Sequence, residues 1–197
     1  MVVDSHKELK ISMVNTPFKG ELKSGDLPFY YREGNHLLLG LIDALGHGKE
    51  ANRLSVEIKA YLDEHWHCNC NQLLYDLNDA IANSIGAAIS LAHINLSSAD
   101  IEFAGVGNVK GYIIGEKNNS FVSKDGVVGQ NMRSPLVQKK KLVKRDKVIF
   151  CSDGIQERFY VLADRQKLAL SPEQVTRYIQ NEFGKDHDDA SCMVFEY

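Results

Sequence analysis

Four short acidic motifs are the part of this sequence best suited to chemistry. They are Gly25-Asp26, Asp43-Ala44-Leu45-Gly46-His47-Gly48, Ser152-Asp153-Gly154 and Asp188-Asp189-Ala190-Ser191. Asp43 and Asp153 each follow a run of apolar residues, so each carboxylate is expected where a buried strand ends. A carboxylate removed from water is costly unless cations or hydrogen-bond donors meet it. The pattern therefore predicts that these aspartates bind something positively charged.

Convergence of these aspartates at one place would require a cation. Two like charges about 4 Å apart repel by roughly 4 kcal/mol at an effective dielectric constant of 20, and the four motifs contain no lysine or arginine to offset this. An all-carboxylate shell suits Mg²⁺ or Mn²⁺ rather than zinc. Carboxylates that bridge two such ions form a binuclear site that lowers the pKa of a shared water. That chemistry is typical of hydrolases of phosphate esters.

The apolar pattern around the first two motifs predicts the elements that hold them. Residues 37–42 are apolar without alternation, which indicates a strand buried on both faces. An amphipathic helix over 49–65 follows, so residues 46–48 form a strand-to-helix turn with Asp43 at its mouth. A hairpin between 29–32 and this strand would bring Asp26, in a predicted turn at 23–26, to the same sheet edge.

The last two motifs also adjoin predicted strands. Residues 148–151 form a continuous apolar strand that ends at Asp153. A helix is expected from Pro172, a residue favoured at the first helical position, and the final strand covers 192–195. If that strand is antiparallel to its neighbours, Asp189 at its start lies at the edge where the strands of Asp43 and Asp153 end.

The rest of the chain predicts further strands and one more helix. Alternation indicates a strand over 8–16, and residues 71–84 form a second amphipathic helix. A hairpin joins 87–96 to 101–105, and strands at 109–114 and 121–123 flank a turn at 115–120.

Three other features could indicate ligand binding but are interpreted as structural. Residues 65–70 contain two histidines and two cysteines, but their spacing matches no common zinc site, so a helix end with a loop is favoured. His93 lies inside a strand pattern and is interpreted as a hydrogen-bonded structural histidine. Lys139-Lys140-Lys141 has no interleaved aromatic residues, so it indicates a solvated edge strand rather than a phosphate-binding patch.

Composition limits the class of protein. The chain has 197 residues, 44% of them hydrophobic, and a net charge of −3, which predicts a single domain over 1–197 and no binding to nucleic acid or membrane. Residues 1–8 lack a signal-peptide core, and no apolar run approaches the ~20 residues of a spanning helix. The four cysteines do not resemble a disulfide framework. A cytoplasmic monomer is expected.

In their order and separations, the four motifs resemble those of the PPM-type metal-dependent serine/threonine phosphatases, in the SpoIIE branch. The resemblance covers essentially the whole chain and is closest to the small stressosome phosphatases of that branch. It implies an α+β fold in which a β-sandwich of two antiparallel sheets is flanked by helices. This fold agrees with the order of strands and helices predicted above.

The resemblance also implies the roles of individual residues. Two Mn²⁺ or Mg²⁺ ions would be bridged by Asp43, and the backbone carbonyl of Ala44 would bind one of them. Asp153 and Asp189 would complete the two shells, and Asp26 would act directly or through water. Asp43, Asp153 and Asp189 are the predicted catalytic residues. Water activated by the metals would attack the phosphorus in line, without a phosphoenzyme.

Two departures from the family pattern affect this turn. Ala44 replaces a glycine found in many relatives, which narrows the backbone conformations available but leaves carbonyl ligation possible. His47 lies four residues after Asp43, further than the proposed general acid of type 2C phosphatases lies from its aspartate. That role is therefore not transferred, and His47 is expected to order the turn.

The implied substrates are phosphorylated stressosome proteins (RsbS- and RsbR-like), with negative regulation of the sigma-B general stress response. Two alternatives remain open: a metal-dependent hydrolase of a small phosphate ester, and a binding module that keeps the fold without catalysis. A cysteine phosphatase is disfavoured because six residues, not five, separate Cys151 from Arg158.

Overall fold

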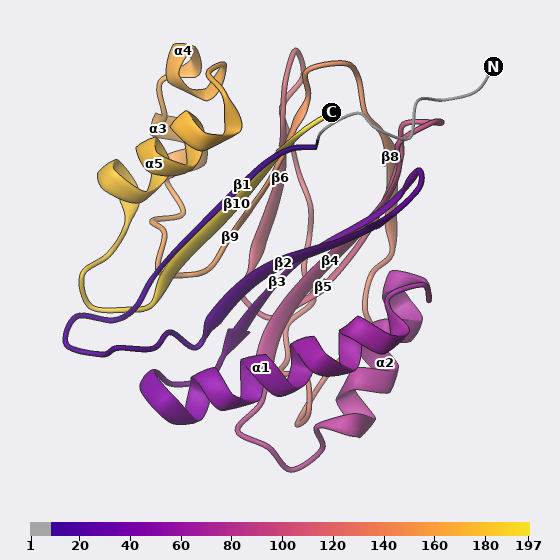
Figure 1. Cartoon of the computed structure of the whole chain (residues 1–197), viewed down its shortest axis with the longest axis vertical. Coiled ribbons are helices and arrows are strands. Elements are labelled where there is room, and N and C mark those ends of the chain that lie inside the picture. Colours follow the sequence, from indigo (N-terminus) through magenta and orange to yellow (C-terminus); the bar gives the residue numbers. More distant parts are fainter. Residues whose placement is uncertain (1–8) are drawn as a thin grey trace.

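The computed structural model describes residues 9–197 (Figure 1). Residues 1–8, where no signal peptide is expected and where the predicted strand 8–16 begins, lie outside the described residues. Within the described part, no helix is long and apolar enough to cross a membrane.

Two antiparallel sheets of five strands pack face to face. The first has, in spatial order, β1 (Lys10–Thr16), β10 (Ala190–Glu196), β9 (Lys147–Cys151), β6 (Lys110–Ile114) and β7 (Asn119–Ser120). The second has β2 (Asp26–Glu33), β3 (His36–Ala44), β4 (Ala87–Asn95), β5 (Asp100–Val106) and β8 (Gln138–Lys141).

Helices cover the outer face of each sheet, as Figure 1 shows. The second sheet is covered by α1 (Gly48–His65) and α2 (Cys70–Ala80). The first is covered by α3 (Phe159–Leu162), α4 (Arg165–Leu168) and α5 (Pro172–Phe183). The predicted α+β sandwich flanked by helices is confirmed.

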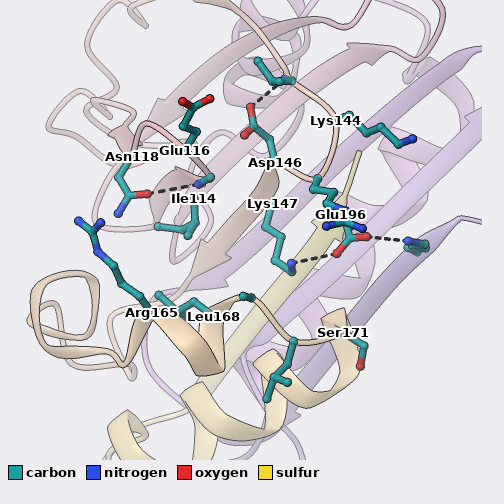
Figure 2. Close-up of a pocket in the computed structure, with 16 residues that line it drawn as sticks. Ile114, Glu116, Asn118, Lys144, Asp146, Lys147, Arg165, Leu168, Ser171 and Glu196 are labelled. Atoms are coloured by element: carbon teal, nitrogen blue, oxygen red, sulfur yellow. Dashed lines mark hydrogen bonds and ion pairs between the residues drawn. The ribbon is translucent and has the colours of Figure 1, made fainter.

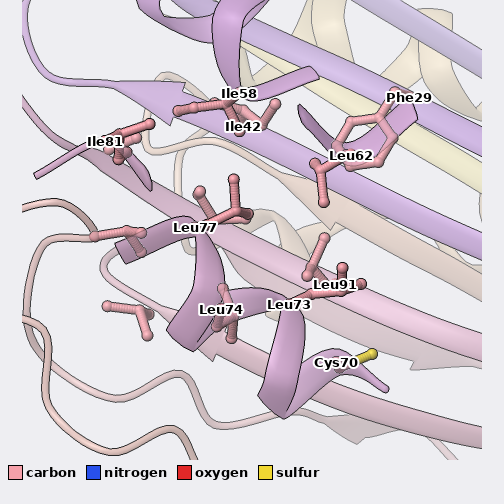
Figure 3. Packing of buried hydrophobic residues seen from close by; sticks show 14 of the residues in the cluster. Phe29, Ile42, Ile58, Leu62, Cys70, Leu73, Leu74, Leu77, Ile81 and Leu91 are labelled. Atoms are coloured by element: carbon pink, nitrogen blue, oxygen red, sulfur yellow. The ribbon is translucent and has the colours of Figure 1, made fainter. Parts of the chain in front are cut away.

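Strand β3 lies at the centre of the packing and is buried on both faces, as its apolar run predicts. Leu37, Leu39 and Leu41 point between the two sheets. Leu38 and Ile42 belong instead to the cluster under α1 and α2, which Figure 3 shows from close by. Alternate side chains of a strand face opposite sides, so a strand between two apolar layers needs an unbroken apolar sequence.

Helix α1 also forms as its apolar pattern predicts, here with the spacing of a helix. Its buried positions include Ala51, Leu54, Ile58 and Leu62, which lie on one face at spacings of three and four residues. Helix α5 begins with Pro172 after a capping box formed by Ser171 and Gln174, as the proline predicts.

The structure corrects four predictions of secondary structure. Helix α2 ends at Ala80 rather than at residue 84, because Asn83 adopts a left-handed φ of 67°. Asp26 begins β2 instead of lying in a turn. The short strand after β6 is Asn119–Ser120, not 121–123. The helices α3 and α4 were not predicted, since four-residue helices are too short to show a periodic pattern.

The plainer interpretations of the three remaining motifs agree with the structure. Asn69 caps α2 by accepting a hydrogen bond from the Gln72 N–H (2.9 Å), and Trp66 and Cys70 are buried. Nε2 of His93 lies 2.8 Å from the carbonyl of Cys68. The lysine run forms β8, which is an edge strand of the second sheet.

Candidate active site

Four strands place the predicted aspartates at one edge of the sandwich. Asp26 begins β2 and Asp43 lies near the end of β3, and the two are direct partners in the antiparallel register. Asp153 follows β9, and Asp189 precedes β10, whose start lies beside the end of β9 because these strands are antiparallel. The carboxylates of Asp26, Asp153, Asp188 and Asp189 all raise the pKa of Asp43, so the predicted convergence is visible in the electrostatics.

Burial makes the charged form of Asp26 and Asp43 unfavourable. Asp26 is 2% exposed, and burial raises its pKa to about 7, although nearby serine hydroxyls lower it and two carboxylates raise it further. Burial and then the surrounding carboxylates raise the pKa of Asp43 to about 9. Shifts in this direction mark buried acids without a positive partner, and such acids concentrate at functional sites.

The charge of Asp153 is better compensated than the charges of Asp26 and Asp43. Its pKa is raised by burial and then by the Asp188 carboxylate, whereas Lys185 and Asn108 lower it. Nδ2 of Asn108 donates to Oδ2 of Asp153 at 2.7 Å, and Nζ of Lys185 donates to the Asp153 carbonyl at 2.5 Å. Lys185 is thus a cation beside the acidic motifs, a few residues before the fourth one.

Asp189 has a different environment from the other aspartates. It is 3% exposed, and its Oδ1 and Oδ2 accept hydrogen bonds from the backbone N–H groups of Phe18 and Gly25, both at 2.7 Å. These two bonds tie the loop between β1 and β2 to the start of β10. Asp189 therefore fixes the backbone that leads into Asp26, while Asp188 is the member of the pair that interacts with Asp153.

The strand-to-helix turn is ordered by contacts of His47. Its ring stacks on Phe18 with centroids 4.8 Å apart, and its Nδ1 lies 3.1 Å from Oε1 of Glu21. Ala44, just before this turn, donates its N–H to the carbonyl of Gly25 at 3.3 Å. The contacts of His47 agree with the predicted role in ordering the turn.

The donor chemistry of this edge fits Mg²⁺ or Mn²⁺. All candidate ligands are oxygens, and Oδ2 of Asp26 is buried without a hydrogen-bond partner among residues 9–197. A buried polar atom without a partner is uncommon, and a cation would satisfy this one. No group of three or more His, Cys, Asp or Glu side chains within residues 9–197 already has a metal-binding arrangement.

Sequence reasoning missed three residues of this edge: Asn108, Lys185 and Asp188. Asp188 belongs to a motif that the sequence singled out, but two adjacent aspartates in a loop give no signal of which one faces the site. Asn108 follows Gly107, whose φ of 90° marks a tight turn between β5 and β6. Only the pairing of β6 with β9 brings that turn to Asp153.

The two sheets with outer helices are the fold of PP2C-type (PPM) phosphatase domains. The family model for Stage II sporulation protein E (SpoIIE) matches residues 33–197, and the chain belongs to this family.

Individual relatives are similar to this chain at low sequence identity. Phosphoserine phosphatase RsbX of Bacillus subtilis (strain 168) is 24% identical over 119 residues, which are 60% of this chain and 60% of that protein. The structure of RsbX in complex with magnesium has a TM-score of 0.84 at 19% identity and covers 98% of this chain and 97% of that one.

Two further solved structures share the fold. One comes from work that describes the bacterial stressosome as a modular system adapted to control secondary messenger signaling. It has a TM-score of 0.89 at 23% identity and covers 96% of this chain and 100% of that one. The structure with the PP2C phosphatase domain of SpoIIE from Bacillus subtilis has a TM-score of 0.82 at 19% identity. The match covers 96% of this chain and 63% of that one.

Proposed function

We propose that this chain is a metal-dependent serine/threonine protein phosphatase. The observation that carries the proposal is the edge where Asp26, Asp43, Asp153 and Asp188 meet, two of them with pKa values raised to about 7 and about 9. Membership of the SpoIIE family supports the same activity. Carboxylates held this close without a cation would be destabilising, so an edge of this kind is best explained by metal binding.

Asp43 would bridge two Mn²⁺ or Mg²⁺ ions, since it interacts with every other carboxylate of the edge. Asp26, Asp153 and the Ala44 carbonyl would complete the shells. Asp188 would supply the metal ligand that the family resemblance assigned to Asp189, because both oxygens of Asp189 already accept backbone hydrogen bonds. Bound divalent ions supply an activated water and neutralise charge on the phosphate.

The protein's own groups orient this arrangement. Asn108 holds Oδ2 of Asp153, so that Oδ1 would be the atom that coordinates. Asp189 fixes the backbone of Gly25 and so sets the position of Asp26. Outer hydrogen bonds of this kind orient metal ligands and raise metal affinity.

The proposed substrates are phosphoserine and phosphothreonine on stressosome proteins (RsbS- and RsbR-like) in the cytoplasm, with negative regulation of the sigma-B response as the outcome. The similarity to RsbX and to a chain from work on the bacterial stressosome supports this assignment.

The substrate class is tested with three substrates: a serine-phosphorylated stressosome protein, a phosphoserine peptide of unrelated sequence and p-nitrophenyl phosphate. We expect Mn²⁺-dependent release that is fastest, by kcat/KM, from the stressosome protein. Release from p-nitrophenyl phosphate alone would favour a hydrolase of small phosphate esters and contradict the proposal.

A binding module without catalysis is the second candidate. One observation favours it: the described residues contain no preformed group of three metal ligands. Calorimetric titration with Mn²⁺ separates the two candidates without an activity assay. Binding of two ions per chain supports the phosphatase, and no binding by the folded protein supports the binding module.

A further inference from the structure

A pocket of about 620 Å³ lies at the end of the first sheet opposite to the acidic edge. Its walls are the β6–β7 turn, the loop before β9, α4 with the connection to α5, and the ends of β1 and β10. Lys147, at the start of β9, precedes Asp153 by six residues, which is roughly 20 Å along an extended chain. The pocket is thus separate from the candidate active site, and its volume is typical of small-molecule sites.

Basic side chains outnumber acidic ones in this pocket. Five lysines and arginines face three carboxylates: Lys10, Lys144, Arg145, Lys147 and Arg165 against Glu116, Asp146 and Glu196. Two of the three acids already have partners. Glu196 pairs with Lys10 at 2.6 Å and with Lys147 at 2.9 Å, and Oδ2 of Asp146 accepts the Val143 N–H at 2.8 Å.

Three of the basic side chains are left for a ligand. Over residues 9–197, the side chains of Lys144, Arg145 and Arg165 make no hydrogen bond or ion pair with protein groups. Figure 2 shows Arg165 rising from α4 below Asn118 on one side of the pocket, with Asp146, Lys147 and Glu196 on the other. Since five basic side chains face three acidic ones, the lining as a whole keeps a net positive charge.

The wall opposite Arg165 contains two buried charged side chains. Lys147 is 4% exposed and Asp146 is 8% exposed. Arg145 adopts a left-handed φ of 76°, and its N–H donates to the carbonyl of Tyr197 at 2.9 Å. A residue other than glycine held in this region is uncommon, and such strain concentrates at functional sites.

Part of the pocket lining is apolar. Ile114, Leu168 and Leu170 are among the lining residues. A ligand that matches both parts carries negative charge at one end and an organic group at the other. Guanidinium and ammonium groups together recognise phosphate well.

We propose that this pocket binds a small organic phosphate, such as a nucleotide or a sugar phosphate, independently of the phosphatase site. The phosphate pairs with the guanidinium of Arg165 under the net positive charge of the lining, and the organic part packs on the apolar lining residues.

The test is calorimetric titration of the full chain with ADP, ribose 5-phosphate and inorganic phosphate, each in EDTA so that the acidic edge holds no metal. We expect saturable binding of at least one organic phosphate, about tenfold tighter than inorganic phosphate. ADP binding tighter than ribose 5-phosphate assigns the site to nucleotides, and the reverse assigns it to sugar phosphates.

Two variants of helix α4 provide the matched comparison. Arg165→Ala should weaken binding about tenfold, since it removes an unpaired guanidinium of the pocket. Lys167→Ala removes the same charge from the same helix, but Lys167 lies 4.7 Å over the ring of Tyr178, outside the pocket lining, so binding should be unchanged.

The proposal is overturned if none of the three compounds binds saturably up to millimolar concentration. It is also overturned if inorganic phosphate binds as tightly as both organic phosphates, or if Arg165→Ala and Lys167→Ala weaken binding equally. Because the titration contains no metal, failure of the phosphatase activity would not affect its outcome.

Discussion

Asp43 is the residue on which the electrostatics of the candidate site depend most. It is half-buried, it has no hydrogen bond to a basic group in the described part of the chain, and four other aspartates act on it. The usual pKa of an aspartate is near 4, and burial together with the neighbouring carboxylates raises the pKa of Asp43 to about 9. When a metal ion binds, the proton of this carboxyl group must leave before Asp43 can coordinate, so metal binding and proton release are coupled.

This shift predicts how stability changes with pH in EDTA. Because the folded-state pKa values of Asp26 and Asp43 lie above the unfolded value of 3.8, the folded protein binds more protons between about pH 4 and pH 9. The free energy of unfolding should therefore fall as pH rises through this window and level off above it. Asp43→Asn should raise the melting temperature at pH 8 in EDTA, by about 2–4 °C for each kcal/mol gained.

Thermal melts of wild type and Asp43→Asn at pH 5 and pH 8 check this prediction. The two proteins should melt closer together at pH 5, because the cost of keeping Asp43 protonated in the folded state is small near the unfolded pKa of 3.8 and grows as the pH rises. A variant that is less stable than wild type at pH 8 would contradict the account of Asp43.

Asn108 is predicted to position Asp153 rather than to bind metal itself. Removal of its 2.7 Å hydrogen bond by Asn108→Ala should weaken Mn²⁺ binding about 10–100-fold, as for other outer-shell partners of metal ligands. Calorimetric titration with Mn²⁺ measures this. Asn131→Ala, at an exposed position, is the control, and equal affinities for the two variants would refute the role of Asn108.

The adjacent aspartates 188 and 189 are predicted to have separable roles. Asp189→Ala leaves the buried N–H of Gly25 and the partly buried N–H of Phe18 without acceptors and should lower the free energy of unfolding by roughly 2 kcal/mol. Asp188→Ala should leave stability in EDTA nearly unchanged and weaken Mn²⁺ binding. Urea unfolding and metal titration of both variants test this, and interchange of the two phenotypes would disprove it.

At the scale of elements, the sequence predicted what periodicity and burial determine. Strand β3 was predicted because a strand between two apolar layers needs an unbroken apolar run, and α1 because its apolar residues recur at helical spacing. The end of α2 was missed because Asn83 leaves the helix to donate its N–H to Gly129, a contact distant in sequence. Asn108 could not be found because β6 pairs with β9 across almost 40 residues.

The packing of β3 predicts a large cost for a core truncation. Leu39 is fully buried between the sheets, so Leu39→Ala should lower the free energy of unfolding by about 2–5 kcal/mol. Leu22→Ala makes the same chemical change at a side chain that is 96% exposed and should alter it by less than about 0.5 kcal/mol. Urea unfolding measures both, and a similar loss in the two variants would be inconsistent with this packing.

At the scale of the molecule, the sandwich gathers residues that are far apart in the sequence. The hairpin β2–β3 contributes Asp26 and Asp43, and the adjacent strands β9 and β10 contribute Asp153 and the pair at 188–189. Neither sheet holds the whole set, so the candidate site exists only when the two sheets pack together. The sequence predicted this convergence from the positions of the aspartates relative to their strands, but it assigned the last ligand to Asp189, whereas Asp188 is the residue that acts on Asp153.

The most direct test of the account is release of phosphate from serine- and threonine-phosphorylated stressosome proteins. It is measured with Mn²⁺, with Mg²⁺ and with EDTA, for wild type and for Asp43→Ala, after unfolding curves have shown that both proteins are folded. The account predicts release that requires a divalent ion and is lost in Asp43→Ala. Release that persists in EDTA, or in the folded Asp43→Ala protein, would contradict it.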